Sequence, residues 1–412
     1  MTEKSTKPQL RFAGFDDTWE QRKVGELLIE RNEQAPMNEE YPLMAFIANE
    51  GVAPKGERYD RSSLVTDTEN KLYKRTEFGD FIYSSNNLET GSIGLNKYGK
   101  ACISPVYSVF HPTGIADSNF LGRRLVRKDF INSMVKWRQG VIYGQWRIHE
   151  SDFLKIDIPV PSVEEQRQIG TFLGYLDNLI TLHQRKYDKL TNVKKSMLEK
   201  MFPKNGSNVP EIRFKGFSDA WEQRKLGDIV ERVVRKNTNN ESSLPLTISA
   251  QYGLVDQITY FNNRVASRDV SNYYLVLNGE FAYNKSTSDG FPFGAVKRLD
   301  LYEKGVLSTL YIVFSIKNQS EIDSDYLTVF FDTDRWHKGV SERAAEGARN
   351  HGLLNISADD FFDIDIFLPV HKEEQVVIGS YLRHLDNLIT LHQRELEKLK
   401  NLKKACLEKM FV

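Results

Sequence analysis

The decapeptide LDNLITLHQR stands at residues 176–185 and again, unchanged, at residues 385–394. It lies inside a longer repeat, because residues 164–202 and residues 373–411 share 26 of 39 positions. Neither copy contains proline, and its apolar residues recur at steps of four and three, which is the spacing of a coiled-coil seam. The pattern predicts a long amphipathic helix in each copy.

Each predicted helix would be about 58 Å long, and a single amphipathic helix must bury its apolar stripe to be stable. The duplicate helix is the natural mate, so we expect an antiparallel intramolecular coiled coil with pseudo-two-fold symmetry. His183 and His392 fall at matching seam positions, where a polar residue that sets the register is commoner than a metal ligand or a pH switch. The expected seam residues are Ile169, Leu173, Leu176, Ile180, Leu190, Ile378, Leu382, Leu385, Ile389 and Leu399.

A second repeat stands well upstream of each predicted helix. Residues 8–27 read PQLRFAGFDDTWEQRKVGEL and residues 210–229 read PEIRFKGFSDAWEQRKLGDI, with 12 of 20 positions identical. We call this upstream repeat the head. The order of head, variable part and long helix therefore occurs twice, with a period too long for a solenoid repeat. We infer a single duplication, in which the shared parts meet the same kind of partner and the divergent parts meet different ones.

The variable parts, residues 20–160 and 222–370, predict compact domains. They hold short apolar runs bounded by Gly and Asn, such as GDFIYS at 79–84 and GEFAYN at 279–284, which are typical of strands. Short helical patterns separate these runs. We predict an α+β fold class, with two tandem α/β domains, each built on a mostly antiparallel sheet, separated by the two long helices. The predicted boundaries are residues 1–160, 161–209, 210–372 and 373–412.

The composition excludes several classes of protein. The 412 residues are 40% hydrophobic and 11% aromatic, which favours packed cores over disorder. No apolar run is long enough to predict a membrane span, and the first residues do not resemble a signal peptide. Two cysteines, Cys102 and Cys406, are too few for a disulfide framework or a four-cysteine zinc site. We expect a cytoplasmic protein with no cofactor and no metal.

The motifs of common enzymes are missing from the sequence. It has no GxxxxGK[ST] phosphate loop, no HExxH zinc motif and no GxSxG nucleophile elbow. The acidic pairs at 164–165 and 373–374 stand in the first turn of a predicted helix, where negative charge suits the helix dipole. We therefore expect a protein that is not an enzyme, and a fused nuclease or methyltransferase is the alternative.

The two heads, the two helices and the turns before them together resemble one family. The turns read PSVEEQ at 161–166 and, one residue longer, PVHKEEQ at 369–375. With the RFxGF…WEQRK heads and the LDNLI helices, they resemble the specificity subunit of a type I restriction–modification system over nearly the whole chain. The resemblance implies two target-recognition domains, each reading one half of a bipartite double-stranded DNA target.

The same resemblance implies partners. The helices would fix the gap between the half-sites and dock two methyltransferase (modification) subunits, while restriction and translocase subunits would complete the complex. The chain itself would be non-catalytic. Leucines beside the predicted seam suggest an apolar docking surface, namely Leu179, Leu182, Leu388 and Leu391. A duplicated scaffold or ligand-binding protein without a DNA role is the remaining alternative.

Candidate DNA contacts follow from residue type and position. Bases are read chiefly by Arg, Lys, Asn and Gln, and phosphates by basic and hydroxyl side chains. Two loops are rich in such residues, 137–148 and 337–352, and the ends of the GDFIYS and GEFAYN strands add more. An ordinary solvated side chain is the alternative for each. The predicted contacts are Ser84, Asn86, Arg138, Tyr143, Gln145, Arg147, Lys285, Ser286, Lys338, Arg343, Arg349, Asn350 and His351.

The charge balance limits nonspecific attraction to DNA. The chain has 56 basic and 56 acidic residues, and residues 222–372 alone hold 17 positive against 21 negative. Because phosphate attraction scales with the number of phosphates neutralised, affinity should come from local clusters and from partner subunits. One basic cluster has no counterpart in the second domain and is either a phosphate track or a solvated helix face. It consists of Arg123, Arg124, Arg127 and Lys128.

Overall fold

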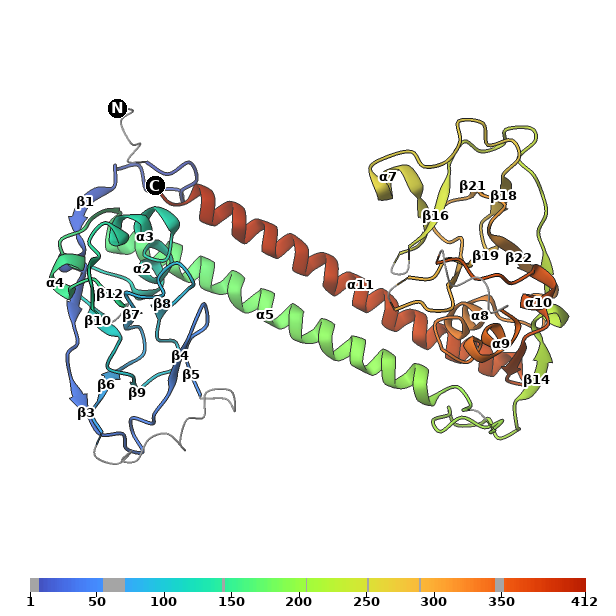
Figure 1. Cartoon of the computed structure of the whole chain (residues 1–412), viewed down its shortest axis with the longest axis horizontal. Coiled ribbons are helices and arrows are strands. Elements are labelled where there is room, and N and C mark those ends of the chain that lie inside the picture. The colour runs from blue at the N-terminus through green and yellow to red at the C-terminus, as the bar shows by residue number, and fades with distance from the viewer. Residues whose placement is uncertain are drawn as a thin grey trace. The chain divides into compact units, whose positions relative to one another are not determined.

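The computed structural model describes residues 7–54, 71–142, 145–204, 206–249, 252–288, 290–344 and 352–412. The chain forms two compact units (Figure 1). Unit 1 comprises Met1–His183 with Glu395–Val412, and unit 2 comprises Gln184–Arg394. Each unit therefore takes in one globular domain and part of both long helices.

Unit 1 is an α+β domain in which every pairing between the named strands of the described residues is antiparallel. Its main sheet has the order β2-β10-β7-β8, and a smaller sheet has the order β3-β6-β9. The GDFIYS run forms the buried strand β7 between β10 and β8. The elements are β1 (Glu20–Lys23), α1 (Val24–Leu27), β2 (Leu28–Glu30), β3 (Gln34–Ala35), β4 (Ala45–Ile47), β5 (Gly51–Ala53), β6 (Tyr73–Thr76), β7 (Phe81–Tyr83), β8 (Ile93–Leu95), β9 (Ala101–Ile103), β10 (Ser108–Pro112), α2 (Ser118–Arg124), α3 (Lys128–Val135), β11 (Gln139–Ile142), β12 (Gln145–Arg147), α4 (Glu150–Phe153) and β13 (Asp157–Val160).

Unit 2 repeats this plan with different loops. Its main sheet has the order β15-β22-β19-β20, and the GEFAYN run forms β19 at the place that β7 holds in unit 1. The elements are β14 (Glu222–Lys225), α6 (Leu226–Ile229), β15 (Val230–Arg232), β16 (Leu246–Ser249), β17 (Gly253–Asp256), α7 (Gln257–Phe261), β18 (Tyr274–Leu277), β19 (Phe281–Asn284), β20 (Ala295–Arg298), β21 (Lys304–Leu307), β22 (Ile312–Ile316), α8 (Ser324–Phe330), α9 (His337–Arg343), α10 (Ala358–Phe362) and β23 (Asp365–Leu368). The predicted fold class is confirmed, since both domains mix helices with antiparallel strands.

The repeated head closes each domain on itself. The EQRK of the first head forms β1, which pairs with β13 so that Glu20 faces Val160 and Lys23 faces Asp157. The second head does the same through β14 and β23. Each variable domain therefore begins and ends in one two-stranded ribbon, directly before its long helix.

The two long helices form as the heptad spacing predicts. Helix α5 spans Val163–Lys200 and helix α11 spans Lys372–Lys409, each with 38 residues. The first three seam residues of each helix are buried in the core of a globular domain, and the later ones are half-buried or packed at its margin. The buried ones are Ile169, Leu173 and Leu176 in unit 1 and Ile378, Leu382 and Leu385 in unit 2; the half-buried ones are Ile180, Leu190, Ile389 and Leu399.

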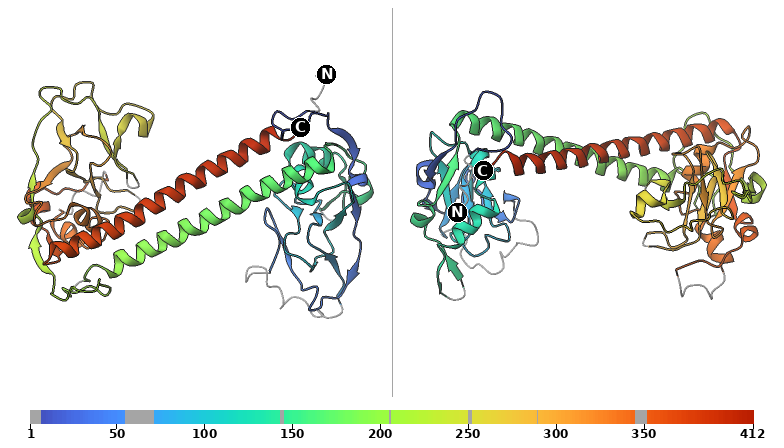
Figure 2. Two further views of the ribbon diagram at one scale, coloured as in Figure 1. Left: turned by 180° about the vertical axis from the view of Figure 1, so that it is seen from behind. Right: turned by 90° about the horizontal axis from the view of Figure 1, so that it is seen from above.

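Within unit 1 the start of α5 packs with the end of α11, so the two helices run antiparallel there. Met410 and Phe411, at the end of α11, lie in the same core as Ile169. An ion pair of 2.6 Å joins Asp177 to Lys403 beside this core. Figure 2 shows the end of α11 set against the unit 1 domain in both views.

Unit 2 contains the same arrangement with the roles of the helices exchanged. Met201 and Phe202, which follow α5, lie in one core with Ile378 of α11. Lys194 and Asp386 form an ion pair of 2.6 Å, and these are the repeat counterparts of Lys403 and Asp177. The same contact is therefore made in each unit, with the roles of the two helices exchanged.

Glycine allows each long helix to approach a short helix of its domain. A Cβ atom at Gly170 of α5 would lie 2.5 Å from Asp117 Oδ1 and 3.2 Å from Phe120 N, at the start of α2. At Gly379 of α11 it would lie 2.6 Å from Tyr326 N, at the start of α8. A larger residue would push the helix away from the domain. Despite their length, no helix among the described residues is apolar enough to cross a membrane.

Replacing Phe411 with alanine should destabilise unit 1. Its ring is 5% exposed, packs edge-on to Trp19 and stacks on Phe120. Loss of a buried aromatic ring costs about 3–5 kcal/mol of the free energy of unfolding. Thermal denaturation with limited proteolysis should show unit 1 cleaved at a lower temperature than in the unaltered chain. Leu402→Ala, on the exposed side of α11, is the matched control; equal cleavage temperatures for the two variants would contradict the role of Phe411.

Candidate nucleic-acid interface

A buried ion pair fixes the head of each unit to the start of its long helix. Arg11 donates from Nε and Nη2 to the two carboxylate oxygens of Glu165 at 2.8 and 2.7 Å. Arg213 donates in the same way to Glu374 at 2.7 and 2.8 Å. Both glutamates are buried, so the second acid of each acidic pair anchors the head in addition to standing in the first helical turn.

A glutamine in each turn braces a short helix of the same unit. Gln166 accepts from Asp117 N at 3.0 Å and donates to a proline carbonyl of the turn. Gln375 accepts from Asp323 N at 3.0 Å and also donates to a proline carbonyl. The two aspartates are the N-caps of α2 and α8. The extra residue of the second turn therefore leaves this bracing unchanged.

The candidate DNA-contacting loop of unit 1 is the β11–β12 hairpin, and both of its ends are tied to the loop at 84–92. Arg138 donates to the two carboxylate oxygens of Glu89 at 2.7 Å each and to Ser85 O at 3.0 Å. Ile148 N donates to Ser85 Oγ at 3.0 Å. The hairpin and the loop therefore form one substructure.

The predicted contacts of unit 1 differ in how far they are exposed. The side chain of Arg147 is 67% exposed, whereas that of Arg138 is 12% exposed and engaged with Glu89. Ser84 is buried, and Asn86 is half-buried with an Oδ1 atom that has no hydrogen-bond partner in the described part of the chain. The guanidinium of Arg147, 3.9 Å from Glu150, is thus open to solvent, while that of Arg138 is held by Glu89.

Two tryptophans were not selected from the sequence: Trp137, which precedes the hairpin, and Trp146, in its second strand β12. Trp137 and Trp146 are both exposed, which is unusual for so large an apolar side chain. The signal was present in the sequence, since both stand among Arg and Gln in the Gly-jointed stretch WRQGVIYGQWRI. Tyr143 and the side chain of Gln145 lie outside the described residues.

In unit 2 the residue after strand β19 contacts backbone atoms of the segment that follows the variable loop. Lys285 O accepts from Leu354 N at 2.9 Å, and Lys285 Nζ donates to Ile356 O at 3.3 Å. Ser286 is exposed and forms an isolated bridge with Leu353. The strand that ends in GEFAYN is thus linked to the segment after the variable loop, as in unit 1.

The remaining predictions of unit 2 lie on α9 and beyond it. Lys338 is exposed, 3.7 Å from Glu342. Arg343 donates to Asp363 Oδ2 at 2.6 Å and is largely covered. Arg349, Asn350 and His351 lie outside the described residues. The two units therefore present different side chains on a similar frame.

A network of buried charges holds the unit 2 domain on both helices. Lys194 of α5 lies 2.9 Å from Asp332 and 2.6 Å from Asp386 of α11, and Lys297 of β20 lies 2.7 Å from Asp332. Burial alone would raise the pKa of Asp332, but Lys297 and Lys194 lower it to about 2. Burial opposes the charge of Lys194 too, yet Asp332 and Asp386 raise its pKa.

The described residues contain no group of three or more His, Cys, Asp or Glu side chains that could hold a metal ion. The arrangement that they do contain is a repeated frame carrying two dissimilar polar loops.

Comparison with known proteins shows the family. The family described as Type I restriction modification DNA specificity domain matches residues 16–192 and 218–401, so the chain belongs to this family of DNA-recognition subunits. The type I restriction enzyme MjaVIII specificity subunit of Methanocaldococcus jannaschii is 25% identical over 94% of this chain and 91% of its own length. In fold, the chain is similar to the type I restriction–modification S subunit from M. genitalium, with a TM-score of 0.60, 13% identity, and 98% and 99% of the two chains covered. The predicted resemblance is confirmed.

Replacing Asp332 with asparagine should destabilise unit 2, because Lys194 and Lys297 would lose the carboxylate between them. Breaking a buried ion pair on one side costs about 3 kcal/mol of the free energy of unfolding. Chemical denaturation at pH 7 would measure this, with the neighbouring exposed Asp334→Asn as the control, expected within about 0.5 kcal/mol of the unaltered chain. Equal losses in both variants would contradict the network.

The same network predicts a pH dependence. The folded pKa of Asp332, about 2, lies below its ordinary value of 3.8, so its stabilising contribution is complete above about pH 4 and is lost as the pH falls toward 2. The difference in stability between the unaltered chain and Asp332→Asn should therefore shrink between pH 4 and pH 2. A difference that stayed constant over this range would show that the charge of Asp332 is not the source of the stability.

Proposed function

We propose that this chain is the non-catalytic specificity subunit of a cytoplasmic type I restriction–modification complex. Each recognition domain reads one half of a bipartite double-stranded DNA target. The helical pair sets the gap between the half-sites and docks two methyltransferase subunits, and restriction and translocase subunits join the same complex.

One observation carries this proposal: the frame of the two units is the same, while the loops differ. The Arg11–Glu165 and Arg213–Glu374 pairs repeat in geometry, whereas a hairpin with Arg147 in unit 1 corresponds to α9 and its following segment in unit 2. A reader of two unlike half-sites requires this combination, because base contacts must differ while their supports stay fixed.

The repeated decapeptide supports two equivalent docking surfaces. Leu182 and Leu391 occupy the same position in the two copies and are 47% and 52% exposed. Leu179 and Leu388 beside them are half-buried. Identical surfaces on the two helices suit two copies of one partner, which is the stoichiometry that the proposal gives to the methyltransferase subunits.

Sequencing of DNA methylation in cells that carry this chain and its modification subunits tests the proposed function. The expected result is an adenine-methylated bipartite motif with a fixed gap, which disappears when the gene for this chain is deleted. Methylation that persisted without the chain, or that lacked a bipartite motif, would overturn the proposal. Binding of S-adenosylmethionine by the isolated chain would overturn its non-catalytic part.

Lengthening both helices together should change the gap and leave the half-sites unaltered. Seven residues inserted after Arg185 in α5 and seven after Arg394 in α11 would preserve the Asp177–Lys403 and Lys194–Asp386 pairs, since each pair lies on one side of the insertions. Seven residues lengthen a helix by about 10 Å, which is the length of roughly three base pairs along the DNA axis.

The methylated motif of this variant should keep both half-sites and contain a longer gap. Seven Gly and Ser residues inserted between Gly206 and Val209, after the end of α5, form the control and should leave the gap unchanged. An unchanged gap in the helix variant would contradict the spacing role of the helices.

A further inference from the structure

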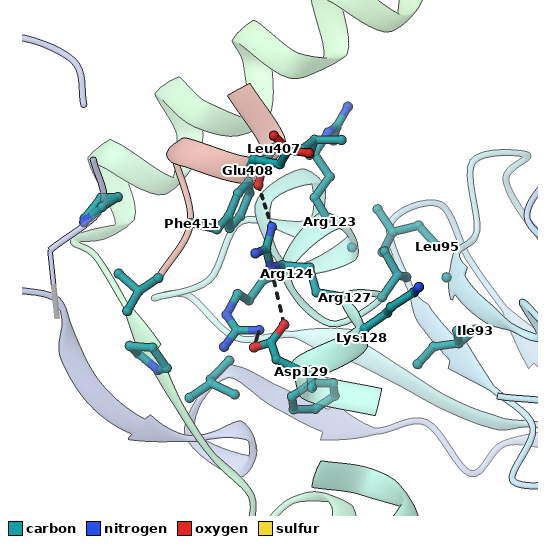
Figure 3. Close-up of a pocket in the computed structure, with 18 of the residues that line it drawn as sticks. Ile93, Leu95, Arg123, Arg124, Arg127, Lys128, Asp129, Leu407, Glu408 and Phe411 are labelled. Atoms are coloured by element: carbon teal, nitrogen blue, oxygen red, sulfur yellow. Dashed lines mark hydrogen bonds and ion pairs between the residues drawn. The ribbon is translucent and has the colours of Figure 1, made fainter. Parts of the chain in front are cut away.

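Unit 1 contains a cavity of about 1170 Å³ that the proposed recognition loops do not use. Its walls come from α2, from β8, from the turn between β4 and β5, and from the last turn of α11. Figure 3 shows Arg123, Arg124, Arg127 and Lys128 around this hollow. The basic cluster selected from the sequence is therefore the lining of a cavity.

The basic side chains of the cavity exceed the carboxylates that pair with them. Arg123 lies 2.7 Å and Lys403 2.6 Å from Asp177, so two cations share one carboxylate. Lys97 stands near the same group, and partial burial together with Arg123 and Lys403 lowers its pKa, although Asp177 opposes this. An additional anion here would relieve the repulsion among the cations.

A second shortage of acceptors lies deeper in the cavity. Arg124 Nη1 lies 2.9 Å from Asp129 Oδ2 and Arg127 Nε lies 3.4 Å from Asp129 Oδ1, while Arg127 Nη1 donates to Leu407 O. The side chain of Arg124 is 5% exposed, yet its Nε atom makes no hydrogen bond to the described residues. Burial lowers the pKa of Arg124, which reflects the poorly compensated charge. Buried donors without acceptors are costly, so an incoming acceptor would be favoured.

Acidic residues at the rim moderate this positive charge without removing it. Glu50, Asp157 and Glu408 also line the cavity, and Asp157 is paired with Lys23. The whole lining has seven basic and five acidic side chains. The surplus is therefore local, on the wall formed by α2, the start of α3 and the end of β8.

Unit 2 has no basic residue at the positions of the four basic residues around α2, and it has acidic residues at two positions of the basic wall. Aligning α2 with α8 and β8 with β20 places Asp334 at the position of Lys128 and Asp300 at that of Lys97. Asp332 corresponds to Val126, so the carboxylate that satisfies Lys194 in unit 2 has no counterpart beside Lys403. The excess of cations is specific to unit 1.

The cavity adjoins the proposed DNA-contacting substructure. Asn49 lies in the β4–β5 turn, lines the cavity and donates from its backbone N to Gly91 O at 3.0 Å. Gly91 belongs to the loop at 84–92, to which Arg138 ties the β11–β12 hairpin. A chain of hydrogen-bonded contacts thus links the hairpin to the cavity lining.

We propose that this cavity of unit 1 binds backbone phosphates of the duplex next to the first half-site, so that sequence-independent attraction to DNA comes mainly from unit 1. The inference rests on the proposed function, and it adds that the two recognition domains contribute unequally to the sequence-independent affinity for DNA. Phosphate oxygens would supply the acceptors that Arg124 lacks and the second anion that Lys97, Arg123 and Lys403 lack. Guanidinium and ammonium groups are the usual partners of phosphate.

The double variant Lys97→Gln/Lys128→Gln tests this proposal. Lys128 is exposed, Lys97 is partly covered where it lines the cavity, and neither forms an ion pair within the described part of the chain, so the fold should persist. The complex of this chain with its methylation subunits is titrated with duplex DNA that carries the methylated motif. The dissociation constant for this DNA is measured over a range of salt concentrations. Loss of two phosphate contacts should lower the slope of log affinity against log salt by about 2 and weaken binding about tenfold or more at low salt.

The preference for the motif over a duplex with one altered half-site should stay the same, because phosphates carry no sequence information. Lys189→Gln/Lys195→Gln, two exposed lysines of α5, removes the same charge and should leave the slope near that of the unaltered complex. A slope unchanged by the first variant, or changed equally by both variants, would overturn the proposal. A loss of motif preference with an unchanged slope would also overturn it, by assigning the lysines to base reading. If the unaltered complex shows no motif preference, the proposed function itself fails.

Discussion

The core of each unit is completed by the far end of a helix that begins in the other unit. Phe411 closes the core of unit 1 beside Trp19, and Phe202 closes the core of unit 2 beside Trp221. Neither domain can bury its aromatic interior with the residues of its own repeat alone. Each core therefore contains residues from both repeats. The heads, the two-stranded ribbons and the Arg–Glu ion pairs are built around these shared cores. Large buried aromatic rings dominate such cores, so the shared cores are also where much of the stability resides.

Around these shared cores, each unit has parts that are the same in both repeats and parts that differ between them. The Gln166 and Gln375 braces hold α2 and α8 in equivalent places, even though the turns before them differ by one residue. The segments that follow those helices nevertheless differ in charge, because Lys128 after α2 stands where the second unit has Asp334 after α8. A frame secured by buried hydrogen bonds tolerates such changes, since the varied side chains lie outside the bonds that secure it.

Much of this fold could be predicted from the sequence, because its signals are local or repeated. Heptad spacing predicted both long helices, and alternation predicted strands such as β7. The heptad spacing could not predict which residues cover Ile169 and Leu173, which pack into a domain core. Periodicity identifies the buried face of a helix but does not identify the element that packs against it. Arg138 was chosen for its chemistry, but its engagement by Glu89 depends on a contact between residues 49 positions apart. No spacing rule could have supplied that contact, nor the placement of the exposed Arg147 next to it.

The position of Phe411 and Met410 at the very end of the described chain bears on how the protein is made. A ribosome delivers the first domain early, yet the core of that domain includes residues that are synthesised after the whole of unit 2. The second unit, Gln184–Arg394, is one continuous stretch of chain and does not have to wait for later residues. Unit 2 should therefore complete its core before unit 1 does, although most of unit 1 is made first. Premature termination within the last turns of α11 would thus damage the half of the molecule that was made first.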